Sequence, residues 1–511
     1  MKVPRLAIAA ILLLALIVAA AVAVRVFLGG DAIKAAIEAQ ASAALGRPVT
    51  IGTATPKLFP RVGLDLTDIA IGSAREVTIE QARLTTGLRA LFGRRVEDAE
   101  ISIQRSRIDV PWALGLLGAL TDSPEKAPTT GPMALTIESV GTLALRDITM
   151  VAGTHTLLVD LDSSLSAGDR FVIQRLHGTS ERSDLVASGE LTSVAKRTGA
   201  LTVDAQSLDL DGLLAFLAAA TPAGAAASPS PGSAPPPPAT VPLHLDVGVK
   251  ARQGRAAGAA FTNLETTAKV RGSAVTLEGL KMNIFGGRFD GTVGFDGTKG
   301  SPRYEWRGAV DNLDVPAIVA FAGAPGAMTG RLSGTMALAA SGLDPQTALE
   351  RARGTARVAV TDGRVPNLDL VRKVVLAFGR PTGDAPAGSG ETFSRVAATL
   401  AVGGRMLSTN DLTFASRDVD MTGEGTVSLA TQAIDFRTNV ILSKELSAQS
   451  GRDLYRLARE GDRVVLPARI TGTVASPTVF IDMEATLKRA VRNKAQDEIK
   501  SFLDRLGKRI K

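Results

Sequence analysis

"IFGGRFDGTVGFDG", residues Ile284 to Gly297, combines two features that oppose each other. Aromatic and aliphatic side chains alternate with polar ones, as in a β-strand with one buried face, yet glycine recurs throughout. In a strand, glycine marks a bulge, a tight bend or a close backbone approach, and sheets curve through bulges and glycine kinks. The stretch therefore predicts a hairpin in a sheet that curls. The alternative is that Gly286, Gly287 and Gly297 form ordinary hairpin turns.

The period of two recurs elsewhere along the chain. Alternating apolar residues occur in three further stretches: Met133, Leu135 and Ile137; Leu243, Leu245, Val247 and Val249; and Ile434, Phe436, Val440 and Leu442. Strands of this kind are apolar on one face and polar on the other. Helical patterns are fewer, and they cover residues 31–46, 112–120, 210–220, 315–322, 368–378 and 454–457. The sequence therefore predicts a mainly β fold with too few helices to cover its sheet.

Composition argues against several kinds of site. The chain has 511 residues and no cysteine, which rules out a disulfide framework and a thiolate metal site. His155, His177 and His244 lie far apart in sequence, with no carboxylate partner at ligand spacing, so we expect no metal and no cofactor. The net charge of +7 favours anionic partners, but aromatic residues make up only 4%. Because base stacking needs aromatic side chains, we expect no nucleic-acid partner.

The N-terminus indicates export. Uncharged apolar or small residues run from Leu6 to Val24 and include Ile11, Leu14 and Ile17, which is long enough for a helix to cross a membrane. Lys2 and Arg5 precede this run, so the positive-inside rule places the bulk of the chain on the far side of an inner membrane. A cleaved signal peptide is the rival interpretation, because residues 21–23 resemble a cleavage site. Both interpretations export the rest of the chain.

A proline-rich tract divides the β-rich part of the chain. Residues 221–242 contain proline, alanine and serine in a pattern that can neither pair in a sheet nor bury a core. We therefore predict five parts: an anchor at 1–30, a β-rich part at 31–220, a linker at 221–242, a second β-rich part at 243–480 and a helix at 481–511.

The C-terminal segment has a basic amphipathic pattern. Apolar residues recur at helical spacing among lysines and arginines; the residues that carry this pattern are Ile499, Phe502, Leu503, Leu506, Lys508 and Arg509. Two interpretations stand. The helix contacts anionic lipid at a membrane surface or a partner protein, or it caps the last open strand edge with its charges in solvent.

The apolar faces of the predicted strands need a covering. A second sheet, helices or a ligand that is not protein could supply it. The helices are too few, whereas a closed sandwich or barrel and a long curved sheet that holds acyl chains both fit the pattern. Burial is worth about 0.8 kcal/mol per CH₂ group, so an apolar groove would bind lipid strongly.

Several stretches resemble one family. Residues Arg47 to Gly72, directly after the predicted anchor and first helix, are similar to the N-terminal region of the AsmA family of bacterial envelope proteins. Three further stretches are similar to the C-terminal region of the same family: Gly354–Val374, Phe393–Phe436 and Val464–Asp482. The stretch "FGGRFDG" matches a hairpin that is common in the family. These stretches are distributed along the chain between residues 47 and 482.

The resemblance implies a fold and a function. AsmA-like proteins are anchored in the inner membrane, face the periplasm and have an elongated, curved, antiparallel-rich β-groove. They are linked to phospholipid transport and outer-membrane biogenesis. The expected function is therefore movement of phospholipid between the two membranes along an apolar groove, with other envelope proteins as further partners. The alternative is a scaffold for outer-membrane protein assembly that transports no lipid.

The resemblance carries over no catalytic residues, and we expect the protein not to be an enzyme. The positions that match the family's motifs are expected to form the fold rather than a site; they are Gly286, Gly287, Asp362, Gly363, Gly423 and Gly425.

Overall fold

The computed structural model describes most of the chain after the predicted anchor. The described residues are 30–57, 61–87, 95–122, 136–137, 139–166, 169–221, 242–298, 302–342, 351–366, 368, 390–450, 454–455, 458–482, 484–488 and 491. The predicted membrane span lies outside these ranges, and so do residues 499–509, which carry the basic amphipathic pattern of the predicted C-terminal helix. Within them, no helix is both long enough and apolar enough to cross a membrane.

The chain forms two units, residues Met1–Val275 and Thr276–Lys511. The division falls inside strand β15 (Ala274–Ile284), whereas the predicted linker at 221–242 lies almost wholly outside the described residues. The five predicted parts therefore stay a prediction.

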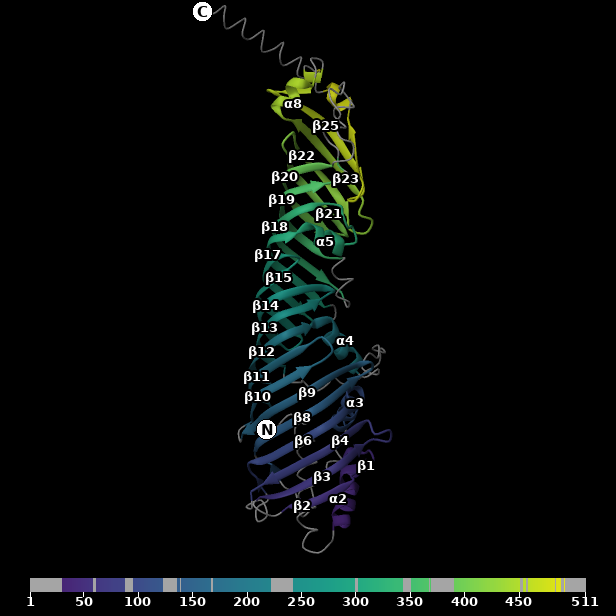
Figure 1. Cartoon of the computed structure of the whole chain (residues 1–511), viewed down its shortest axis with the longest axis vertical. Coiled ribbons are helices and arrows are strands. Elements are labelled where there is room, and N and C mark those ends of the chain that lie inside the picture. The colour runs from purple at the N-terminus through teal and green to yellow at the C-terminus, as the bar shows by residue number, and fades with distance from the viewer. Residues whose placement is uncertain are drawn as a thin grey trace, which may run out of the picture. The chain divides into compact units, whose positions relative to one another are not determined.

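Unit 1 is built on one large sheet (Figure 1). Its strands are β1 (Val49–Thr50), β2 (Thr53–Lys57), β3 (Val62–Ile71), β4 (Val77–Thr86), β6 (Ala99–Asp109), β8 (Val140–Ala152), β9 (His155–Ser166), β10 (Arg170–Thr179), β11 (Asp184–Ser193), β12 (Thr198–Asp209), β13 (His244–Ala256) and β14 (Ala259–Arg271). Both β1 and β2 pair with β3, and each later strand pairs with its predecessor in this series. Two short strands, β5 (Arg95–Val96) and β7 (Thr136–Ile137), pair separately.

The sheet of unit 1 is mixed rather than purely antiparallel. The β6–β8 and β12–β13 pairs are parallel. A parallel pair needs a crossover, and helices α3 (Val110–Asp122) and α4 (Leu210–Ala220) stand at the start of these two connections. The two helices contact each other along one edge of the sheet (Figure 1).

An aspartate at the end of the preceding strand begins each of these helices. A side-chain oxygen of Asp109 accepts a hydrogen bond from the Trp112 backbone N–H at 3.0 Å, and Asp209 accepts one from Gly212 at 3.2 Å. Such N-caps satisfy backbone donors that the first turn leaves free. The helix predicted at 210–220 matches α4, and the one predicted at 112–120 lies within α3.

Unit 2 contains strands that are all antiparallel in the described pairings. Its strands after β15 are β16 (Gly287–Asp296), β17 (Arg303–Asp314), β18 (Thr329–Ser341), β19 (Arg353–Val365), β20 (Glu391–Gly403), β21 (Met406–Ala415), β22 (Val419–Ser428), β23 (Ile434–Leu442), β24 (Arg459–Glu460), β25 (Arg463–Gly472) and β26 (Pro477–Ile481). From β16 to β23 each strand pairs with the next, and β25 pairs with β23, β24 and β26.

The helices of the described residues are few and short, as predicted. Helix α2 (Gly30–Leu45) agrees with the prediction for 31–46 within one residue at each end, and α5 (Val315–Phe321) agrees with that for 315–322. Unit 2 also contains α8 (Lys444–Gln449) near its C-terminal end. The helix predicted at 368–378 lies outside the described residues except for Leu368.

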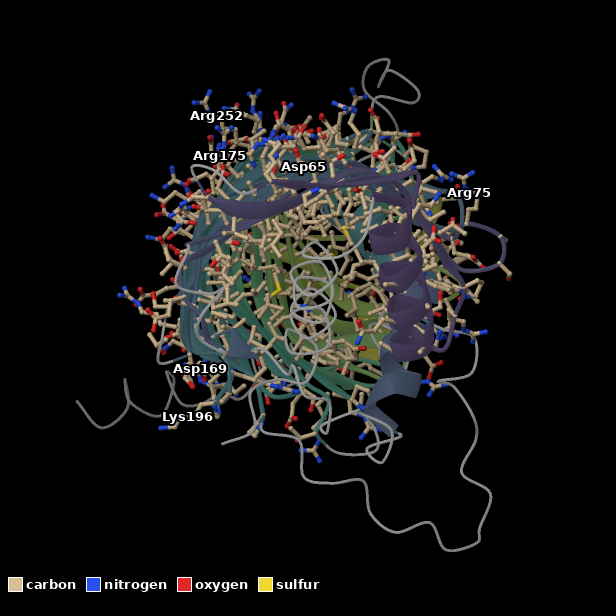
Figure 2. All side chains as sticks on the ribbon, turned by 90° about the horizontal axis from the view of Figure 1, so that it is seen from below. Asp65, Arg75, Asp169, Arg175, Lys196 and Arg252 are labelled. Carbon is tan, nitrogen blue, oxygen red and sulfur yellow. The ribbon has the colours of Figure 1, made fainter. Side chains whose placement is uncertain are left out.

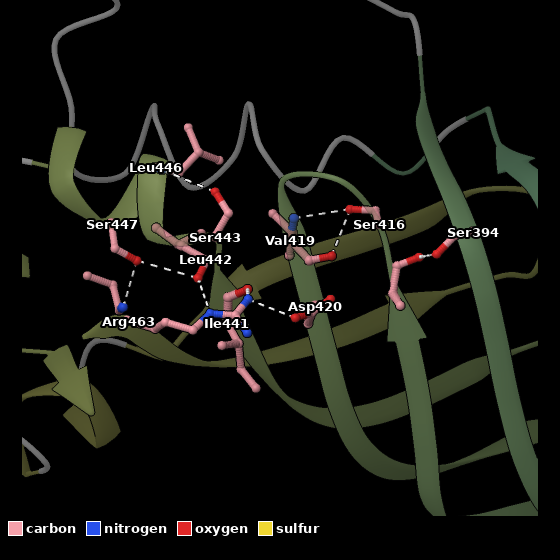
Figure 3. Close-up of polar contacts among 12 residues, drawn as sticks. Ser394, Ser416, Val419, Asp420, Ile441, Leu442, Ser443, Leu446, Ser447 and Arg463 are labelled. Atoms are coloured by element: carbon pink, nitrogen blue, oxygen red, sulfur yellow. Dashed lines mark hydrogen bonds and ion pairs between the residues drawn. The ribbon is translucent and has the colours of Figure 1, made fainter. Parts of the chain in front are cut away.

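Hydrogen bonds connect the strands and the helix at the C-terminal end of unit 2 (Figure 3). The Arg463 guanidinium donates to Asp420 at 2.7 Å and to the Leu442 carbonyl at 2.7 Å. The fully buried Ser447 hydroxyl accepts a hydrogen bond from the Val464 N–H at 2.9 Å. The Ser447–Val464 bond joins α8 to β25 and gives a partner to a buried hydroxyl, which would destabilise the fold if it had none. The Arg463 bonds join β25 to β22 and β23.

Bulges interrupt the strands of both units. In unit 1 a register shift of the β8–β9 pair contains Asp147 (φ 54°), and in unit 2 register shifts of the β17–β18 and β18–β19 pairs contain Asn312 (φ 55°) and Asp362 (φ 51°). Asp68 (φ 54°) and Arg105 (φ 48°) also have positive φ, but the pairing skips them without a change of register. A bulge bends its strand and increases the local twist, and aspartate and asparagine enter the left-handed region more readily than most residues. At the three bulges the left-handed backbone conformation is therefore adopted by residues other than glycine.

The opening hairpin has an ordinary tight turn. Phe285 (φ 48°) and Gly286 (φ 70°) connect β15 to β16, and two positive φ values in a two-residue loop are typical of a type I′ turn. Gly287 is the first residue of β16. For Gly286 the structure thus favours the turn over the strand kink.

Candidate functional site

The register of unit 1 places apolar side chains on one face of its sheet. Directly paired residues on neighbouring strands point to the same face. One row of such partners crosses ten strands and is apolar in all but its last member: Leu66, Ala82, Ile103, Leu145, Leu161, Leu176, Ala187, Val203, Val249 and Thr266. We call the face that carries this row the apolar face of unit 1.

The opposite face of unit 1 is charged. Asp65 accepts hydrogen bonds from Lys57 at 2.6 Å and Arg83 at 2.8 Å. Partial burial would raise the pKa of Asp65, but the bonds and charges of Arg83 and Lys57 outweigh it and hold that pKa below its ordinary value. Figure 2 shows Asp65, Arg175 and Arg252 on the outer side of the sheet, whereas carbon atoms fill the inner side.

Unit 2 repeats the arrangement. A row of paired residues crosses eight strands with an apolar side chain on each: Leu313, Leu332, Val360, Val396, Phe414, Met421, Val440 and Leu466. We call the face that carries this row the apolar face of unit 2. On its other side, Arg469 forms two hydrogen bonds of 2.8 Å with Asp435.

Burial differs along each apolar face. In unit 1, Ile37 of α2 is 0% exposed and packs near Leu64 and Leu66, which are also buried. Farther along the same sheet, Val203 and Val249 keep part of their surface exposed. In unit 2 the row is buried from Phe414 onward, whereas Leu332, Val360 and Val396 are only partly buried. The faces are therefore covered by protein at some strands and incompletely covered at others.

Phenylalanine rings lie across from glycine on these faces. Gly254 pairs with Phe261, Gly363 with Phe393 and Gly425 with Phe436. A Cβ atom at Gly363 would lie 2.3 Å from Phe393 Cζ, and one at Gly425 would lie 2.4 Å from Phe436 Cδ1. The glycines thus leave room for a ring to lie flat across the neighbouring strand, which resembles the aromatic rescue of glycine in designed sheets.

The other family-motif positions lie at close backbone approaches or bends. A Cβ atom would lie 2.4 Å from the Asp311 carbonyl oxygen at Gly287 and 2.4 Å from the Arg437 carbonyl oxygen at Gly423. Asp362 forms the bulge next to Gly363. The structure thus places these residues in the sheets and brings them together in no single pocket-like cluster among the described residues.

The histidine and carboxylate side chains form no metal-binding group within the described ranges. No group of three or more histidine, aspartate or glutamate side chains there is arranged to hold a metal ion. His177 does meet a carboxylate, because its Nε2 lies 3.0 Å from Asp184 Oδ1 across the β10–β11 pair. Sequence spacing did not reveal this contact, which depends on the register. The predicted anchor residues and the predicted C-terminal contact residues lie outside the described ranges.

Comparison of the sequence with known proteins finds one family and one curated relative. A model of the AsmA family matches residues 158–408, which extend from β9 to β21. The chain belongs to the AsmA family. It is 20% identical over 264 residues to Protein AsmA of Escherichia coli strain K12, and this match covers 51% of the chain and 42% of that protein. The match thus spans less than half of the curated relative. No solved structure matches the chain.

Proposed function

We propose that this protein binds lipid acyl chains on its apolar faces and moves phospholipid between the inner and outer membranes of a bacterial envelope. The observation that carries the proposal is the strand-to-strand continuity of the two apolar rows, combined with their incomplete burial at Val203, Val249 and Leu332. Membership of the AsmA family and the apolar segment at the N-terminus support a place in the envelope.

The dimensions of unit 1 suit several lipids. Neighbouring strands lie about 4.8 Å apart, so a row that crosses ten strands extends roughly 43 Å. One leaflet of a hydrocarbon core is about 15 Å thick, so this row exceeds the length of one acyl chain. With about 0.8 kcal/mol for each CH₂ group removed from water, even partial contact would hold a lipid firmly.

The proposed movement is passive. Acyl chains would slide along the apolar face, while headgroups stay in water at the edge of the sheet. We propose no chemical step and assign no catalytic residue. Because the hydrophobic effect is non-directional, direction would come from the membranes or from partner proteins.

Adjacent residues of β12 offer a matched test. Val203 lies on the apolar face, and Thr202 points to the opposite face of the same strand. We expect Val203→Asp to reduce the number of phospholipids that co-purify with the full-length protein in mild detergent, because it places a charge where acyl chains would lie. Thr202→Asp should leave that number unchanged. Native mass spectrometry counts the lipids, and circular dichroism verifies folding.

Two results would contradict the proposal. A folded wild-type protein without bound lipid would favour the scaffold alternative, which needs no apolar ligand. Equal lipid loads in the Val203→Asp and Thr202→Asp variants would show that lipid binds elsewhere.

A further inference from the structure

A pocket of about 650 Å³ lies at the edge of unit 1 where α4 follows β12. It is formed by the first turns of α4, by the ends of β9 and β13, and by the turn between β10 and β11. A volume of this size is within the range of small-ligand sites. Sequence analysis did not predict this pocket, because its parts come from segments that only the sheet register brings together.

Part of the pocket is apolar. Leu157, Leu213 and Phe216 line it, and Phe216 is only 7% exposed. Leu157 also pairs with Met150, which belongs to the same face as the apolar row of unit 1. The pocket is therefore continuous with the apolar face, so a molecule could have its tail on that face and its polar end in the pocket.

Two carboxylates of the pocket already have structural roles. Asp209 caps α4 by accepting from the Gly212 N–H. Asp211 accepts hydrogen bonds from the backbone N–H groups of Ala257 at 2.7 Å and Gly258 at 2.9 Å, so it holds the β13–β14 turn. Neither group needs a ligand to satisfy it.

Three other charged side chains of the pocket are available to bind a ligand. Within the described part of the chain, Arg182 and Glu181 have no hydrogen-bond or ion-pair partner, and both are exposed at the β10–β11 turn. Arg255 approaches Asp211 only at 3.9 Å, with half of its side chain exposed. The pocket thus offers two guanidinium groups and one carboxylate beside an apolar wall.

We propose that this pocket receives the zwitterionic phosphodiester headgroup of a lipid whose acyl chains lie on the apolar face of unit 1. The phosphate binds Arg182 and Arg255, because the planar guanidinium matches phosphate oxygens in a bidentate geometry. The ammonium group of an ethanolamine headgroup binds Glu181. This inference rests on the proposed function and adds selection for a headgroup to it.

A competition between two lipids tests the inference. The full-length protein is incubated with equal amounts of phosphatidylethanolamine and of diacylglycerol with the same acyl chains, and native mass spectrometry gives the ratio bound. We expect the wild type to bind more phosphatidylethanolamine than diacylglycerol. In the Arg182→Ala/Arg255→Ala variant this bound ratio should fall roughly tenfold, which is the effect of removing a charge-assisted hydrogen bond. Arg175→Ala/Arg252→Ala, on the outer face, is the matched control and should keep the wild-type ratio.

The position of the ammonium group has its own test. Glu181→Gln removes the carboxylate and keeps the shape, so we expect it to shift binding from phosphatidylethanolamine towards the anionic phosphatidylglycerol. This result supports the inference even if the double arginine variant fails to fold.

The contrary outcomes separate the inference from the proposed function. In the first of them, the wild type binds both lipids and does so in the same ratio as the double arginine variant and Glu181→Gln. That result would contradict headgroup binding in the pocket, while lipid binding on the apolar faces would still be supported. If the folded wild type binds neither phosphatidylethanolamine nor diacylglycerol, the proposed function fails and the pocket with it.

Discussion

Strands β18 and β23 of unit 2 have the same alternating pattern but different surroundings. Leu332 of β18 and Val440 of β23 belong to one row of paired residues. Val440 is 0% exposed within a cluster that includes Leu466 and Val464, whereas Leu332 is only partly buried. The pattern therefore determines which face a side chain takes, while other elements determine whether that face is closed. The incompletely covered strands are the ones available to a ligand.

The largest expected effect concerns stability at the closed end of unit 2. Leu466→Ala removes a fully buried side chain and should lower the free energy of unfolding by about 2–5 kcal/mol. Leu332→Ala, on the same face, should cost less than half as much, because part of that side chain already contacts water. Urea denaturation of the two variants measures the difference. Equal losses would contradict the distinction between covered and incompletely covered strands.

A smaller effect is expected where glycine faces a ring. In Gly363→Ala the new methyl group would lie 2.3 Å from Phe393 Cζ and 2.2 Å from the Thr329 carbonyl oxygen, so backbone or ring must move. We expect a loss of about 1–3 kcal/mol, the usual cost of overpacking. Gly294→Ala is the control, since its nearest neighbour, Glu305 Cβ, would be 3.8 Å away. Thermal denaturation should separate the two variants, and equal melting temperatures would exclude a steric role for Gly363.

The smallest expected effect is at the charged face of unit 2. Hydrogen bonds from Arg469 hold the pKa of Asp435 below its ordinary value. A carboxyl group with a lowered pKa stabilises the folded state above its ordinary pKa, and this contribution is lost as the pH falls through the lowered one. We therefore expect Asp435→Asn to make stability less dependent on pH below about 4. Because the pair is exposed, the change should be slight, and added salt should reduce it.

Sequence patterns predicted the local structure well for physical reasons. Period-two alternation and helix caps depend on neighbouring residues, so β13, β23, α2 and α4 were found where the sequence indicated. Pairing partners depend on register, which alternation alone does not determine. The ring of Phe393 over Gly363, the contact of His177 with Asp184 and the pocket beside α4 all require strands to be aligned, and therefore they were not predicted.

Direct contact between lipid and alternate residues of one strand would test the central claim most directly. A photoreactive amino acid is placed in turn at six consecutive positions of β13, Leu245 to Lys250, and cross-linking to phospholipid is measured in membranes. We predict labelling at Leu245, Val247 and Val249 and none at the other three positions, Asp246, Gly248 and Lys250. Labelling without this period of two, or no labelling at any position, would contradict lipid binding on the apolar face.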